Sequence, residues 1–206
     1  LIEKPVFVNS KKFNFLQKYK KNIFVGYNRT KFNNIIYLKN LLLKKKNLIC
    51  IVKIPEINKK LFFLNSCHIL SILKFLFGRI KIYNRSTNKN HITLGNSKVK
   101  IDMFINFSNS DNFSIEIFSN QNRYLVCPME TLNIFEKLKK KRIGINNIYF
   151  PLKKKLISEK LNNSFKPGFN KQSKDFIKFL ENGKIPYENS LNFAREIIKL
   201  SEDIFA

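Results

Sequence analysis

A chain of 206 residues is long enough to bury a sizeable hydrophobic core, and its 44% hydrophobic content, with 21 Phe, excludes an intrinsically disordered protein. The formal charge of +25, with a pI near 10.1, is of the kind that attracts polyanions such as nucleic acid. The chain is also crowded with Lys, Asn, Ile and Phe and has no Trp, the set that an AT-rich coding sequence favours. We therefore expect much of the charge to be compositional and to lie on solvated faces.

The three cysteines argue against a disulfide-stabilised or metal-binding protein. Cys50, Cys67 and Cys127 are widely spaced, odd in number and form no C-x-x-C pair, so the sequence predicts neither a disulfide framework nor a metal site. No apolar run reaches the ~18 uninterrupted residues of a membrane span, since the strongest candidate, Ile69 to Phe77, contains Lys74. We expect a cytoplasmic protein without a membrane partner.

The first 27 residues have the pattern of a β-α-β unit. Residues 1–2 resemble the end of a strand, Asn9-Ser10 offers an N-cap to a helix with Phe13 and Leu16 on one face, and 22–27 is a short apolar strand. A unit of this size matches the last one of a doubly wound sheet. The chain also begins without Met or a signal-peptide pattern, so we expect earlier units of that sheet to precede residue 1.

The pattern changes after this unit. A helix is predicted from about 33 to 45, with Ile35, Leu38 and Leu42 on one stripe and the Lys44–Lys46 run at the end where cations complement the helix dipole. From Leu48 onward, short apolar runs alternate with polar clusters that mark turns. These runs predict strands at 48–54, 80–83, 99–107, 113–118 and 123–126.

Three more helices accompany these strands. One runs from Ser66 to Phe77 and is closed by Gly78, and two others, at 169–182 and 191–205, end the chain. Consecutive strands with short polar links predict an open, mostly antiparallel sheet with the helices on one of its faces. The predicted fold class is therefore α+β, and residues 28–206 make up this domain.

Five short motifs follow one another along nearly the whole chain, and each is weak alone. They are Glu3-Lys4-Pro5 after a strand, Val25-Gly26-Tyr27-Asn28-Arg29, His68 at the start of a helix that ends Phe75-Leu76-Phe77-Gly78, Pro128-Met129-Glu130, and Lys166-Pro167-Gly168-Phe169 ahead of Gln172 and Phe176. In order and spacing, they resemble the Gfo/Idh/MocA family (glucose-fructose oxidoreductase / inositol dehydrogenase).

The resemblance implies an NAD(P)-dependent oxidoreductase of two domains. Residues 1–27 are then the remnant of a dinucleotide-binding Rossmann domain, and 28–206 form the substrate-binding and oligomerisation domain. The implied cofactor is NAD or NADP, and Glu3, Lys4 and Pro5 are the residues implied to contact it here. The missing domain is expected to bind most of it, because these 206 residues contain no G-x-G-x-x-G loop. The implied partners are a sugar, nucleotide-sugar or polyol substrate and further copies of the chain, which associate through the sheet.

Oxidising a secondary alcohol needs a base for the hydroxyl proton, and a histidine suits this task because its ordinary pKa lies near neutrality. The resemblance assigns this role to His68 and gives Lys4 the task of holding the substrate oxygen. A cis bond before Pro5 is possible and aims the lysine into the cleft. Tyr27, Arg29 and Asn65 are the candidate substrate-binding residues. The alternatives are a core or capping histidine and a solvated strand-end lysine.

The sequence departs from the family at two positions. Many members place an acid four residues before the histidine and another three residues after it, where this chain has Leu64 and Ser71. Either Asn65 takes over the polar contact, or catalysis is weakened, or the substrate differs. The second histidine, His91, lies in a polar stretch and is expected in an exposed loop.

Two other functions remain open at this point. One is a catalytically inactive scaffold of the same fold, and the other is a basic module that binds nucleic acid. Sheet-type nucleic-acid binders interleave basic and aromatic residues on one face. The runs Lys139–Arg142 and Lys153–Lys155 lack such interleaving in sequence and are expected on solvated helix or loop faces, so no specific nucleic-acid partner is predicted.

Overall fold

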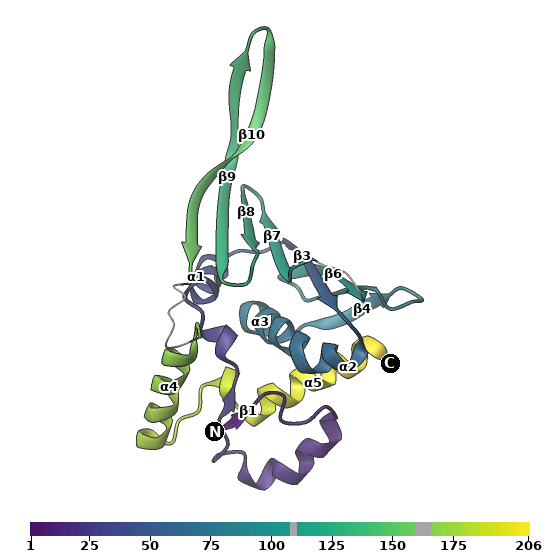
Figure 1. The fold of residues 1–206 in the computed structure, drawn as a ribbon, viewed down its shortest axis with the longest axis vertical. Helices are drawn as coiled ribbons and strands as arrows, with labels where there is room; N and C mark the ends of the chain where they lie inside the picture. Colours follow the sequence, from purple (N-terminus) through teal and green to yellow (C-terminus); the bar gives the residue numbers. More distant parts are fainter. Residues whose placement is uncertain (108–110, 160–165) are drawn as a thin grey trace.

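Apolar residues alternate with polar ones along the central strands, which gives the sheet one apolar face. The computed structural model describes residues 1–107, 111–159 and 166–206 (Figure 1). Its main sheet has eight strands: β3 (Leu48–Glu56), β4 (Lys81–Arg85), β5 (His91–Gly95), β6 (Val99–Phe107), β7 (Ser114–Ser119), β8 (Asn122–Val126), β9 (Thr131–Ile143) and β10 (Asn146–Ser158).

The strand order is β10-β9-β8-β7-β3-β6-β5-β4. All neighbours in this sheet pair antiparallel except β3 and β6, which run parallel with Leu48 opposite Val99. The inner face buries Cys50, Val52, Ile101 and Met103 completely. The predicted α+β fold with an open, mostly antiparallel sheet is confirmed.

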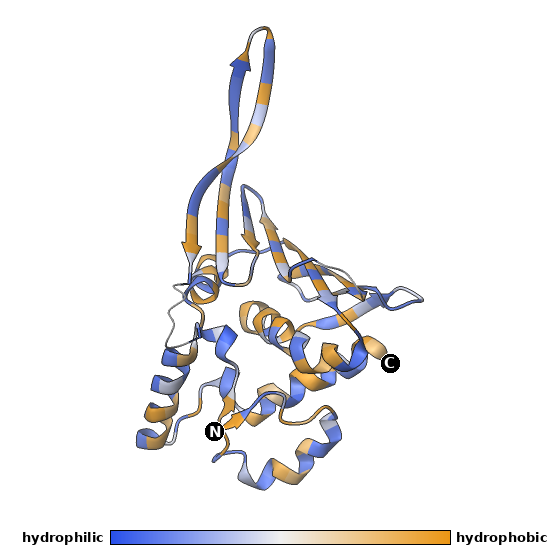
Figure 2. Ribbon diagram, viewed as in Figure 1, coloured by the Kyte–Doolittle hydropathy of each residue, from blue (hydrophilic) through white to orange (hydrophobic). Residues whose placement is uncertain are grey.

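Helices cover that inner face and leave the other one open (Figure 1). They are α1 (Asn33–Leu42), α3 (Cys67–Phe77) and α5 (Leu191–Phe205). The short α2 (Lys59–Leu61) and the π-helical η3 (Phe62–Ser66) lead into α3, so the predicted helix starts earlier than expected. The continuous segment Lys59–Phe77 is long and apolar enough to span a membrane by length and composition, and 67% of it is buried inside the protein. Packing against the sheet explains its hydropathy, which Figure 2 shows in orange.

The N-terminal unit has the predicted parallel arrangement. Strands β1 (Ile2–Glu3) and β2 (Val25–Gly26) pair in parallel, with Ile2 opposite Val25. The helix between them is the 3₁₀ helix η1 (Ser10–Tyr19), capped by the Asn9 side chain, which accepts a hydrogen bond from the Lys11 backbone N–H. The expected cap is therefore confirmed, although the helix is 3₁₀ and not α.

Two predictions about polar segments are wrong. The Lys139–Arg142 and Lys153–Lys155 runs lie on the long strands β9 and β10, not on helices or loops. Likewise, His91 begins strand β5, where its ring stacks on Phe104 at 4.6 Å between centroids. In both places the polar residues contain no signal for a strand. These strands form by pairing with their neighbours, because strand propensity depends strongly on cross-strand packing.

Helix α4 (Phe169–Asn182) is held beside the N-terminal unit by a close backbone contact. Gly168 precedes it with a φ of +80°, and a Cβ at this position would lie 2.2 Å from the carbonyl oxygen of Asn28. Asn28 lies in the short 3₁₀ helix η2 (Asn28–Lys31), and its side-chain amide donates to the Pro167 carbonyl at 3.3 Å. Only glycine fits this crossing without displacing the backbone.

Candidate functional site

Lys4 joins the end of β1 to the helical segment that carries His68. The Lys4-Pro5 peptide bond is cis, as the sequence allowed. The Nζ of Lys4 donates a hydrogen bond to the carbonyl oxygen of Leu64 at 2.9 Å, across 60 residues of sequence. Burial lowers the pKa of Lys4, since the charged ammonium loses part of its hydration. The lysine is thus directed inward and is not a solvated strand-end residue.

His68 is the second residue of α3 and is only 9% exposed. Burial lowers the pKa of its imidazole to about 2, and the nearby cations Lys4 and Arg29 lower it further in the same direction. The ring is therefore neutral at pH 7. Its buried Nδ1 has no hydrogen-bond partner among the described residues. A buried polar atom without a partner is costly, which marks this ring as a candidate for contact with a ligand.

Tyr27 and Arg29 lie near the same cluster, since both interact electrostatically with Cys67. Burial lowers the pKa of Arg29, and this guanidinium acts electrostatically on both Lys4 and His68. Tyr27 is completely buried, and its ring contacts Phe193 of α5 edge to face at 5.4 Å. The Tyr27 hydroxyl has no hydrogen-bond partner among the described residues.

Cys67 is a member of the cluster that sequence reasoning missed. Its Sγ donates to the carbonyl of Leu64 at 3.2 Å, the same oxygen that accepts from Lys4. Burial raises the pKa of the thiol to about 11, although Lys4 and Arg29 counteract part of the rise, so the group stays protonated at pH 7. Its position immediately before His68 was the only available signal.

The two positions where many family members have an acid hold Leu64 and Ser71 here, and Asn65 lies beside Leu64. Leu64 contributes its backbone carbonyl to Lys4 and Cys67. The Ser71 hydroxyl donates to the backbone carbonyl of His68 at 2.7 Å, so it bonds to the helix backbone and not to the imidazole. Asn65 is exposed on the π-helical turn. None of these three side chains supplies a negative charge that would raise the pKa of His68.

Glu3 lies beside β2 and α4. A Cβ built on Gly26 would meet the Nε2 of Gln172 at 3.1 Å and the Oε1 of Glu3 at 3.5 Å. Gln172 is buried, and its Oε1 has no hydrogen-bond partner among the described residues. Three side chains near this strand end, those of Tyr27, His68 and Gln172, therefore hold unpaired polar atoms inside the protein.

Two open hollows of the surface lie away from this cluster. One of about 680 Å³ lies between η1 and α5, and another of about 590 Å³ lies between α3, β4 and α5. Neither is lined by Lys4 or His68. The structure thus brings the two candidate catalytic residues into one cluster, whereas the substrate that the resemblance implies beside them stays a prediction.

No family model and no curated protein matches the sequence. Solved structures do match the fold. A dehydrogenase (MviM) from Clostridium difficile is 18% identical, with a TM-score of 0.67 over 98% of this chain and 69% of that one. UDP-N-acetylglucosamine 3-dehydrogenase GnnA from Acidithiobacillus ferrooxidans is 13% identical, with a TM-score of 0.65 over 98% of this chain and 68% of that one.

A protein from Desulfitobacterium hafniense that is described as an NADPH-dependent oxidoreductase is 10% identical. Its TM-score is 0.69 over 98% of this chain and 68% of that one. At these identities the likeness concerns the fold. The chain therefore has the fold of the C-terminal portion of Gfo/Idh/MocA-type oxidoreductases.

Proposed function

We propose that this chain forms the substrate side of an NAD(P)-dependent oxidoreductase that oxidises or reduces a hydroxyl of a sugar, nucleotide sugar or polyol by hydride transfer. The observation that carries the proposal is the meeting of Lys4 and His68. They come from different parts of the fold and share one cluster around the Leu64 carbonyl. The resemblance of the motifs and the fold of the dehydrogenases supply the reaction class.

In this proposal Lys4 holds the substrate oxygen and His68 exchanges the hydroxyl proton. The imidazole is neutral and has a free lone pair, but a pKa of about 2 makes it a weak base before the substrate binds. Its affinity for that proton rises as negative charge develops on the substrate oxygen, because an adjacent anion stabilises the imidazolium. Lys4 stabilises the same developing charge.

In this proposal Glu3, Lys4 and Pro5 meet only one end of a nicotinamide cofactor. Glu3, Lys4 and Pro5 would approach the ring, which supplies the hydride donor or acceptor when bound. The phosphate-binding loop is not among these 206 residues, so we propose that residues ahead of Leu1 supply it. NAD and NADP are both compatible with this arrangement.

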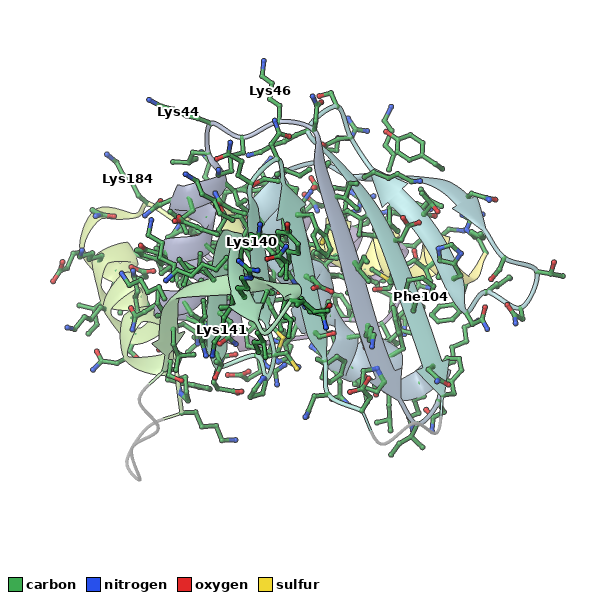
Figure 3. The ribbon with its side chains drawn as sticks, turned by 90° about the horizontal axis from the view of Figure 1, so that it is seen from above. Lys44, Lys46, Phe104, Lys140, Lys141 and Lys184 are labelled. Carbon is green, nitrogen blue, oxygen red and sulfur yellow. The ribbon has the colours of Figure 1, made fainter. Side chains whose placement is uncertain are left out.

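We also propose that copies of the chain associate through the outer face of the sheet. This face carries exposed apolar side chains, among them Ile49 near the start of β3 and Phe104 on β6, which are 51% and 43% exposed. Figure 3 looks down on it and labels Phe104. Exposed apolar groups on an uncovered sheet mark an association surface.

The experiment that tests the function is a reduced-nicotinamide absorbance assay on the protein extended upstream of Leu1. A panel of sugars, nucleotide sugars and polyols is offered with NAD and with NADP. We expect turnover with at least one member of the panel. Failure with every substrate class and both cofactors would favour the catalytically inactive scaffold.

A further inference from the structure

Strands β9 and β10 continue past the sheet as a projecting two-stranded arm (Figure 1). The pairing of β8 with β9 reaches only as far as Asn122 and Glu136, and beyond that point β9 pairs with β10 alone. We define the arm as residues 137–151, all of which are exposed. At ~3.3 Å per residue, the seven residues from 137 to 143 give it a reach of roughly 20 Å.

The arm concentrates positive charge. Between 137 and 151 there are five basic residues and no acidic one, namely Lys137, Lys139, Lys140, Lys141 and Arg142. Figure 2 shows the arm as mostly hydrophilic with apolar positions between. Lys153 and Lys155 continue the charge at its base. Residues 11–21 also carry five Lys and no acidic residue, so what distinguishes the arm is that its cations lie on a ribbon that projects from the sheet.

Strand pairing places apolar and aromatic residues beside these cations. Lys139 lies opposite Phe150, and Lys140 lies opposite Tyr149. Cross-strand neighbours share a face of the ribbon, whereas successive residues alternate between faces. Each face therefore carries a cation next to a ring, which is the interleaving that the sequence runs alone did not show. Figure 3 looks along the arm and labels Lys140 and Lys141.

The charge distribution selects among polyanionic and protein partners. A second copy of the arm is disfavoured as its partner, because both arms carry five cations and no acidic residue and repel each other. A flat anionic surface would contact only one face of the ribbon. The major groove of B-form DNA is about 12 Å wide, admits a two-stranded ribbon and has phosphates on both sides of it.

We propose that the arm binds duplex DNA, lying in the major groove with Lys139, Lys140, Lys141 and Arg142 on the phosphates. Contacts of this kind carry no base information, so the binding is independent of sequence and depends strongly on salt. The site lies on the arm and not on the Lys4–His68 cluster, so it is independent of the oxidoreductase proposal.

The test is fluorescence anisotropy of a short labelled DNA duplex titrated with the 206-residue chain. The arm variant carries Lys139→Ser, Lys140→Ser, Lys141→Ser and Arg142→Ser. A matched variant replaces the equally exposed Lys11, Lys12, Lys20 and Lys21 by Ser, which also removes four charges. We expect the arm variant to bind about 10²-fold more weakly at low salt, with a salt slope smaller by about 3 to 4, and the matched variant to change little.

Several outcomes would overturn the proposal. Equal losses in the two variants would show that the charge acts diffusely over the whole surface. A lack of binding at low salt, or a sequence-specific complex that survives physiological salt, would each contradict it. Titration of both variants with vesicles containing phosphatidylserine separates the remaining case. An arm-dependent loss of vesicle binding without an arm-dependent loss of DNA binding would assign the arm to a membrane surface.

Discussion

Burial and two neighbouring cations dominate the behaviour of His68. Its pKa of about 2 in the folded protein lies far below the value of about 6.5 in an unfolded chain. Below that higher value the unfolded state binds the proton more readily, so this residue makes the folded protein less stable as the pH falls. At neutral pH the effect is absent, because the ring is then largely neutral in both states.

This difference predicts an acid sensitivity that belongs to one side chain. From about pH 6.5 downward, the free energy of unfolding should fall by about 1 kcal/mol per pH unit through His68 alone. His68→Gln, which does not titrate, should remove that part of the slope, whereas His91→Gln should keep it. Urea denaturation between about pH 7 and pH 4.5 measures both. Identical slopes in the wild-type protein and His68→Gln would contradict the assigned burial.

The two catalytic candidates could be named from sequence because their motifs are contiguous, but their surroundings could not. Cys67 and the Leu64 carbonyl enter the cluster through the geometry of a π-helical turn. Periodicity predicts α-helical spacing and contains no signal for this turn. The expected compensation by Asn65 is equally a question of side-chain placement, which the sequence leaves open.

At the scale of elements, strands with apolar alternation were predictable and strands without it were not. The predicted bounds of β6 match the observed strand, and β3 extends only two residues beyond its prediction. The outer parts of β9 and β10 are exposed on both faces, so they have no alternation of burial to detect. Strand β5 was hidden by the polar stretch in which His91 lies.

The crossing of Gly168 over η2 makes a prediction at this same scale. Gly168→Ala places a Cβ 2.2 Å from the Asn28 carbonyl oxygen at a φ of +80°, which combines a clash with backbone strain. Gly183→Ala is the matched control, because its φ is +68° and nothing lies within 4 Å of the added Cβ. Chemical denaturation should show the first variant to be less stable than the second by about 1 to 3 kcal/mol. Equal losses of stability in the two variants would contradict this prediction, because they would mean that the backbone at Gly168 moves to accommodate the Cβ.

At the scale of the whole molecule, the open sheet face predicts self-association. Light scattering after size exclusion should give a mass above that of the 24.4 kDa monomer. Phe104→Glu should shift the mass to that of a monomer, because it places a charge on the apolar face. Phe15→Glu, at a 77% exposed position on η1, should leave the assembly intact. A monomeric wild-type chain would refute the association.

The division of the site between this chain and upstream residues makes a separate prediction. If the proposed function holds, the 206-residue chain should show no useful affinity for NAD or NADP, because it contains no G-x-G-x-x-G loop to hold the pyrophosphate. Isothermal titration calorimetry with both nucleotides measures this directly. Micromolar binding to the chain by itself would place the cofactor site within these residues and overturn the division.

The proposed function assigns the proton exchange in a nicotinamide-dependent reaction to His68. This assignment is tested by kcat of the upstream-extended protein with His68→Ala and, as control, with His91→Ala, the only other histidine of these 206 residues. We expect kcat to fall by about 10²-fold or more in His68→Ala, with the Kd for the cofactor nearly unchanged, and to stay near the wild-type value in the control. An unchanged kcat in His68→Ala, or a loss of cofactor binding as large as the loss of kcat, would contradict the assignment.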